Sequence, residues 1–183
     1  SSAASDVYKR QESNNRVRNL RFNRIALTLF YLGLLICSMQ KEEKRFQIQV
    51  LDVGQGDGIY IESDAGTEIF VDGGSVDVSE VGKYRIRPFL KSHGVREVDY
   101  WFVSHCDADH CNGLMELLET DYPIKHLVFS KYVLKDEAQE ELAALAKQKG
   151  CQVLYMEEGE CFRDTSIRIQ AIYPSEKSVE GER

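Results

Sequence analysis

Residues 104–113 read SHCDADHCNG and gather two histidines, two aspartates and two cysteines in ten positions. Imidazole nitrogens and carboxylate oxygens are common ligands of divalent metal ions. Four such groups, on His105, Asp107, Asp109 and His110, fall within six residues, so they can converge on a small volume. In the alternative interpretation this is a polar loop in which an aspartate or asparagine caps the next helix. The H-x-D-x-D-H spacing before an apolar helix favours a metal site.

The two cysteines of this stretch open a second alternative, in which Cys106 and Cys111 bind zinc together with the histidines. If the loop is strand-like, however, Cys106 alternates with the ligands and points away from them. The five cysteines of the chain show no disulfide framework. We therefore expect free, buried thiols.

The elements around the stretch place it at a sheet edge. Residues 98–105 (VDYWFVSH) form a nearly continuous apolar run, which predicts a central strand. Leucines at helical spacing predict a helix over 112–119, directly after Asp109 and His110. The four polar groups then lie at the carboxyl end of a core strand, where α/β proteins place functional loops.

Hydrophobic patterning predicts a layered α/β (α+β) domain around this strand. Three strands joined by glycine-containing turns open it and indicate an antiparallel start. The further strands expected are 126–130, 151–156 and 165–174, after the opening strands 46–53, 59–63 and 67–74; the further helices are 84–92 and 137–149.

The chain has 183 residues and a net charge of -7, distributed unevenly. Residues 1–24 contain six basic and two acidic residues, so the remainder is strongly acidic and does not attract nucleic acid over its whole surface. Residues 6–11 resemble the translation of a transposon-end sequencing adapter, and we treat 1–14 as an adapter-derived or disordered tail. Residues 15–24 form a basic segment that we interpret as juxtamembrane.

Residues 25–39 form an uncharged apolar run of fifteen residues. We interpret 25–40 as one transmembrane helix at the short end of the usual length. The preceding arginines indicate a cytoplasmic N-terminal side, with the chain from Lys41 onward outside the membrane. A signal peptide, a lipoprotein acylated at Cys37 and a buried soluble helix are the alternatives.

The histidine–aspartate motif resembles the metal motif of the metallo-β-lactamase fold, where H-x-H-x-D-H is more usual. Together with LDVGQGDG (51–58) and IFVDGG (69–74), it resembles the C-terminal domain of ComEC-type DNA internalisation competence proteins. The resemblance runs from about residue 46 to the end. It implies a metallo-β-lactamase-like αββα sandwich, of which residues 46–183 supply the first half.

The resemblance also implies roles for individual residues. Asp109 has a catalytic role as a metal ligand, Asp72 orients ligands from the adjoining strand end, and Gln55 and Asp57 lie at the substrate rim. The implied metal ligands are His105 and Asp107 for the first ion and Asp109 and His110 for the second.

The implied activity is metal-dependent hydrolysis of DNA phosphodiester bonds, a nuclease activity, with single- or double-stranded DNA as substrate. Two divalent ions, zinc or manganese with magnesium as a further candidate, would activate water and stabilise the oxygens of the reaction. Asp107 in place of the usual imidazole shifts the preference towards manganese or magnesium.

The implied setting is a DNA-uptake channel in the cell membrane, with the hydrolase domain on the extracytoplasmic side. Its partners would be the remaining transmembrane domain and other competence proteins. The alternatives are a membrane-anchored metallo-hydrolase acting on another ester or phosphoester, and a non-catalytic DNA-guiding domain. The remaining histidines, His93 and His126, do not match the family's later metal ligands. We therefore expect this fragment alone to bind metal weakly and to lack nuclease activity.

Overall fold

The computed structural model describes residues 22–37, 45–132, 137–163 and 165–174, in two units divided after residue 43. In the first unit, residues 22–37 are helical. None of the helices in the described ranges is both long and apolar enough to span a bilayer. The transmembrane helix expected over 25–40 is therefore not supported. Residues 38–40 and the tail 1–14 lie outside the described residues.

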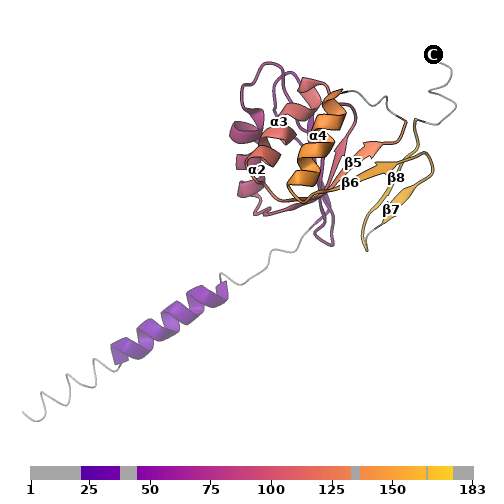
Figure 1. The fold of residues 1–183 in the computed structure, drawn as a ribbon. Helices are drawn as coiled ribbons and strands as arrows, with labels where there is room; N and C mark the ends of the chain where they lie inside the picture. The colour runs from indigo at the N-terminus through magenta and orange to yellow at the C-terminus, as the bar shows by residue number, and fades with distance from the viewer. Residues whose placement is uncertain (1–21, 38–44, 133–136, 164, 175–183) are drawn as a thin grey trace, which may run out of the picture. The chain divides into compact units, whose positions relative to one another are not determined.

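The second unit is built on a six-stranded sheet in the order β1-β2-β3-β4-β5-β6 (Figure 1). Its first three strands are antiparallel, and β3 to β6 run parallel. The antiparallel start and the interior position of the long apolar strand β4 confirm the sequence prediction. The strands are β1 (Gln47–Val50), β2 (Gly58–Glu62), β3 (Glu68–Asp72), β4 (Val98–Val103), β5 (Ile124–Ser130) and β6 (Gln152–Met156).

Helices cover one face of this sheet (Figure 1). A π-helical turn, η1 (Gly82–Ile86), runs directly into α2 (Arg87–Ser92), with Pro88 in its first turn as predicted. The other helices are α3 (Ala108–Glu119) and α4 (Glu137–Gln148). The core lies between these helices and the sheet, where Phe70 stacks on Trp101 at a ring-centroid distance of 4.3 Å.

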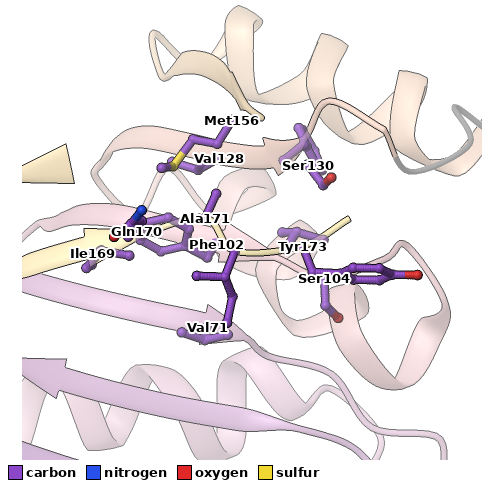
Figure 2. A pocket seen from close by; sticks show the side chains of 13 residues that line it. Val71, Phe102, Ser104, Val128, Ser130, Met156, Ile169, Gln170, Ala171 and Tyr173 are labelled. Carbon is purple, nitrogen blue, oxygen red and sulfur yellow. The ribbon is translucent and has the colours of Figure 1, made fainter. Parts of the chain in front are cut away.

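The opposite face of the sheet is partly covered by a hairpin of β7 (Cys161–Arg163) and β8 (Arg168–Gln170). Phe162 of this hairpin contacts Tyr100 of β4, with ring centroids 4.1 Å apart. Beside it lies an apolar hollow of about 290 Å³, lined in part by Val71, Phe102 and Val128 (Figure 2). The observed architecture is thus an α+β mixed sheet with helices on one face, in agreement with the predicted class.

Several element boundaries differ from the sequence prediction. The strand expected over 165–174 is confined to β8 (Arg168–Gln170), and the one expected over 46–53 to β1 (Gln47–Val50). Helix α3 begins at Ala108 rather than residue 112, so Asp109 and His110 lie in its first turn and not before it. Asp107 is the N-cap residue, and its extended backbone places its carbonyl to accept hydrogen bonds from the N–H groups of His110 and Cys111, at 2.9 and 3.1 Å. The strand β7 is new, because three residues are too few for a visible alternation.

Candidate metal centre

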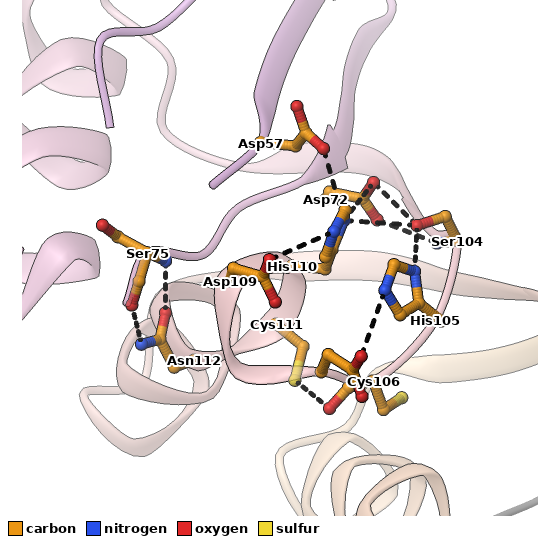
Figure 3. A network of polar contacts seen from close by, with 11 residues as sticks. Asp57, Asp72, Ser75, Ser104, His105, Cys106, Asp109, His110, Cys111 and Asn112 are labelled. Carbon is orange, nitrogen blue, oxygen red and sulfur yellow. Dashed lines mark hydrogen bonds and ion pairs between the residues drawn. The ribbon is translucent and has the colours of Figure 1, made fainter. Parts of the chain in front are cut away.

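The polar stretch lies where β4 ends and α3 begins, beside the end of the neighbouring parallel strand β3 (Figure 3). Because parallel strands bring their carboxyl ends to one edge of the sheet, Asp72 at the end of β3 meets Ser104 just after β4. The loop 54–57 approaches the same edge, since the backbone N–H of Asp57 donates to the carbonyl of Asp109 at 3.1 Å. Three segments therefore form the site.

Asp72 is a buried acidic group of this edge that is held by several hydrogen bonds. Its carboxylate accepts hydrogen bonds from the backbone N–H and the hydroxyl of Ser104, at 2.8 and 2.9 Å. Its carbonyl accepts one from the indole of Trp101 at 2.7 Å. Its φ of 56° lies in the left-handed region, which aspartate tolerates better than most residues. These contacts aim a buried carboxylate at His110, whose Nδ1 lies 3.1 Å away.

His110 lies among three carboxylates. Its Nδ1 is 3.1 Å from Asp72 and 3.6 Å from Asp57, and its Nε2 is 3.7 Å from Asp109. The side chain is only 14% exposed. Burial lowers the pKa of His110, but the hydrogen bond to Asp72 and the surrounding negative charges outweigh it, so the pKa is raised above its ordinary value. The ring therefore sits where positive charge is stabilised.

The other predicted pair, His105 and Asp107, lies further out. The carboxylate of Asp107 is 3.5 Å from Nε2 of His105, and both side chains are substantially exposed. The His105 ring lies 3.8 Å from the ring of His110, and its Nδ1 is 3.0 Å from the hydroxyl of Ser104. The structure thus brings the four predicted ligands into one region as two adjoining His–Asp pairs.

The two predicted rim residues behave differently. Asp57 presents a largely exposed carboxylate to His110. Gln55 takes part through its backbone, because its N–H donates to Asp77 at 2.7 Å and its carbonyl accepts from the N–H of Val76 at 2.9 Å. Sequence reasoning missed Ser104, whose only signal is a small hydroxyl side chain directly after an apolar strand.

The donor set fits a divalent cation. One ligand atom from each of Asp57, Asp72 and His110 lies within 4.8 Å of the other two. This group faces Nδ1 of His110, whereas Asp109 lies beside Nε2. Imidazole and carboxylate ligands bind such ions at roughly 2.0–2.6 Å, so either ring nitrogen has a carboxylate close enough to share an ion after small movements. The carboxylate oxygens favour manganese or magnesium, and the imidazoles of His105 and His110 also suit zinc.

The cysteines of the motif point into the fold. Cys106 and Cys111 form no disulfide and are buried, at 8% and 3% exposed. The thiol of Cys111 donates to the carbonyl of Cys106 at 3.1 Å. Neither belongs to the close group of ligand atoms around His110. The expectation of buried thiols is confirmed for Cys106, Cys111 and Cys151, but it is wrong for Cys37, which is exposed, and for Cys161, which is half-buried.

Comparison with known proteins gives one curated relative and a set of solved structures with a related shape, whereas no family model matches the chain. The chain is 22% identical over 163 residues to ComE operon protein 3 of Bacillus subtilis (strain 168), covering 82% of this chain and 20% of that protein. It therefore spans about a fifth of the relative's length. The relative confirms the resemblance to ComEC-type competence proteins that the motifs predict.

Among the solved structures, a diphosphatase of the PhnP family superimposes with a TM-score of 0.42 at 15% sequence identity. The match covers 69% of this chain and 56% of that one.

Proposed function

We propose that residues 46–183 form part of a metal-dependent hydrolase domain of a ComEC-type DNA-uptake protein, and that it acts on DNA phosphodiester bonds. The observation that carries the proposal is His110, which lies between three carboxylates with the His105 ring 3.8 Å away. This arrangement lies at the carboxyl edge of parallel strands, where α/β folds place ligand sites. The relationship to ComE operon protein 3 supports the same assignment.

We assign the first ion to His105 and Asp107, and the second to Asp109 and His110. Asp72 then orients His110, because a proton on Nδ1 donated to the carboxylate of Asp72 leaves the lone pair of Nε2 free for a cation. Divalent cations at these positions would supply Lewis-acid activation and charge stabilisation for hydrolysis. Asp57, exposed at the open side of His110, would lie where a phosphodiester approaches.

A local cation would also resolve the charge conflict between this chain and its substrate. The net charge of the chain is -7, and the site itself is crowded with carboxylates, so DNA is repelled from the metal-free surface. Bound divalent ions reverse the local charge and attract a phosphate group. We therefore expect substrate binding to depend on metal before any chemistry occurs.

We further propose that the domain works at the cell membrane, on the extracytoplasmic side, together with the transport part of the protein and other competence proteins. The support is the basic segment 15–24 before an apolar run and the relationship to a competence protein. Single- and double-stranded DNA both remain candidate substrates.

A non-catalytic, DNA-guiding role is the second candidate, favoured by the placement of the remaining histidines. His126 lies on the sheet face opposite the helices, stacked on Tyr100 at 4.5 Å, and His93 contacts Phe89 at 4.2 Å. Neither contributes to the group around His110. The chain by itself is therefore expected to bind metal weakly and to leave DNA uncut.

The test uses a longer protein that carries this chain together with the later metal ligands of the resembled family. There, Asp109→Asn is expected to abolish manganese-dependent cleavage of a fluorescent DNA substrate while the thermal unfolding temperature stays unchanged. Cleavage at the wild-type rate would remove Asp109 from the mechanism. Metal-dependent DNA binding without cleavage by the unmutated protein would support the guiding role instead.

A further inference from the structure

The loop that carries Asp57 is fastened to the rest of the site by a chain of polar contacts outside the predicted ligands. Asp77 accepts hydrogen bonds from the N–H of Gln55 at 2.7 Å and from the hydroxyl of Ser75 at 2.8 Å. Asn112 in turn makes two hydrogen bonds to the backbone of Ser75 (Figure 3). Its side chain accepts from the Ser75 N–H at 3.0 Å and donates to the Ser75 carbonyl at 2.7 Å. The contacts run from the helix that bears His110 to the loop that bears Asp57.

The loop 54–57 is closely packed at Gly56. A Cβ on Gly56 would lie 2.2 Å from the carbonyl oxygen of Gly74 and 2.7 Å from that of Asp109. The N–H of Gly74 also donates to the carbonyl of Asp57 at 3.1 Å. The backbone of the loop is therefore pressed against both neighbouring segments, and its orientation sets where the Asp57 carboxylate points.

Asp77 is suited to fix that orientation because it is a charged acceptor. The backbone hydrogen bond from Gln55, followed by the side-chain bond from Ser75, lowers the pKa of Asp77. Hydrogen bonds to ionised acceptors are shorter and stronger than neutral ones. The Asp77 carboxylate contacts Gln55 and Ser75, and it does not belong to the close group of ligand atoms around His110.

We propose that Asp77 and Asn112 are positioning residues that hold the Asp57 carboxylate against His110 and so tune the affinity of the site for divalent cations. The inference rests on the proposed metal site. Asp77, in the connection after β3, then contributes to cation binding through the loop 54–57.

The test compares the full chain with D77A, D77N and E80A, by titration with Mn²⁺ followed through the electron paramagnetic resonance of the free ion. Glu80 is the matched control, because it is an exposed acidic residue of the same connection whose carboxylate pairs with Lys83 at 2.6 Å. We expect D77A to bind Mn²⁺ roughly tenfold more weakly, the size of one lost hydrogen bond to a charged group. D77N keeps an acceptor oxygen and should restore most of the affinity, whereas E80A should match the unmutated chain.

A merely structural role is separated by two further readouts. Urea unfolding shows whether D77A remains folded, and amide hydrogen exchange reports the N–H groups of Gln55 and Asp57 directly. We expect faster exchange at these two amides in D77A and N112A, with exchange in the core of β4 unchanged. Mn²⁺ binding by D77A as tight as by E80A, or unchanged exchange at Gln55, would overturn the positioning role.

The two proposals fail in different ways. If the unmutated chain binds no Mn²⁺ at any concentration in the titration, the metal site is wrong for this chain. The positioning of Asp57 by Asp77 is then decided by amide exchange alone. If the unmutated chain binds and D77A binds equally well, the metal site stands and the positioning role is lost.

Discussion

Strand β3 carries a buried carboxylate at each end, and the surroundings of the two differ. Glu68 begins the strand and is 8% exposed; it accepts a hydrogen bond from the hydroxyl of Tyr60, itself fully buried. Asp72 ends the strand and is 6% exposed; it accepts from Ser104 and faces His110. One carboxylate meets a neutral donor inside the core, and the other meets a titratable ring.

The difference shows that burial of a carboxylate does not by itself identify a site. Tyr60 and Glu68 satisfy each other within the fold, a structural role. At the other end, His110 has further carboxylates on both ring nitrogens, among them the exposed Asp57. Only this end combines a fixed carboxylate with groups that an incoming cation can reach.

The largest effect is expected from Gly74→Ala, which disturbs the backbone next to the Asp72 end of β3. A Cβ there would lie 2.4 Å from the carbonyl oxygen of Ala108 and from the backbone nitrogen of His110. Neither can move without shifting α3, so we expect a loss of about 3 kcal/mol or more in the free energy of unfolding. Gly159→Ala is the control, with φ of 87° but open space around it, and should cost about 1 kcal/mol. Equal losses in urea unfolding would contradict the close packing at the site.

Asp72→Asn and Glu68→Gln separate the two carboxylates directly. Because the N–H of Ser104 must keep an acceptor oxygen at Oδ1, an asparagine at 72 turns its amide N–H₂ towards Nδ1 of His110. Nδ1 then accepts this hydrogen bond, the ring proton moves to Nε2, and the lone pair that a cation needs is lost. We expect Mn²⁺ affinity to fall by roughly 10- to 100-fold, the usual effect of losing such an orienting partner. Glu68→Gln should cost about 1–3 kcal/mol in stability and leave Mn²⁺ affinity unchanged. A similar loss of Mn²⁺ binding in both variants would abolish the distinction.

The pH dependence of stability tests the surroundings of Glu68, the carboxylate with a structural role. Burial, and then the charge of Glu68, raise the pKa of Tyr122 to about 12 from an ordinary value of 10.0. Between pH 10 and 12 the unfolded chain therefore loses this proton while the folded chain keeps it, so the free energy of unfolding falls as pH rises. The slope is at most about 1.4 kcal/mol per pH unit for one group. Tyr122→Phe should flatten this part of the curve; an unaltered slope in pH-dependent urea unfolding would show that Tyr122 does not set it.

The smallest effect on binding is expected from Cys111→Ala, which tests the thiolate alternative. The side chain is 3% exposed and its thiol donates to the carbonyl of Cys106. We expect a loss of about 1 kcal/mol in the free energy of unfolding, because a small buried group is removed. Binding of Mn²⁺ and Zn²⁺, measured by calorimetry, should be unchanged. A marked loss of Zn²⁺ affinity alone would favour the cysteine-containing site.

Local pattern predicted much of the fold, because the leucine spacing in α3 follows from contact with one core. The alternation in β1 located a strand but gave the wrong buried face, since Ile48 and Val50 are exposed. The predicted start of α3 was wrong. Asp107 caps the helix without a side-chain hydrogen bond, and the residues beside it do not indicate a helix start. The site could be predicted as far as its residues are adjacent in sequence. The contacts of Ser104 with Asp72 and of Asp77 with Gln55 could not, because they join segments brought together only by the sheet.

The central claim is that His110 is the focus of a cation site, and a Mn²⁺ titration of His110→Gln against His126→Gln tests it most directly. Both replacements remove an imidazole, but His126 stacks on Tyr100 away from the carboxylates. We expect His110→Gln to weaken Mn²⁺ binding at least tenfold, the size of one lost charge-assisted contact, and His126→Gln to bind like the unmutated chain. Equal affinity of the two variants, with both folded, would contradict the account.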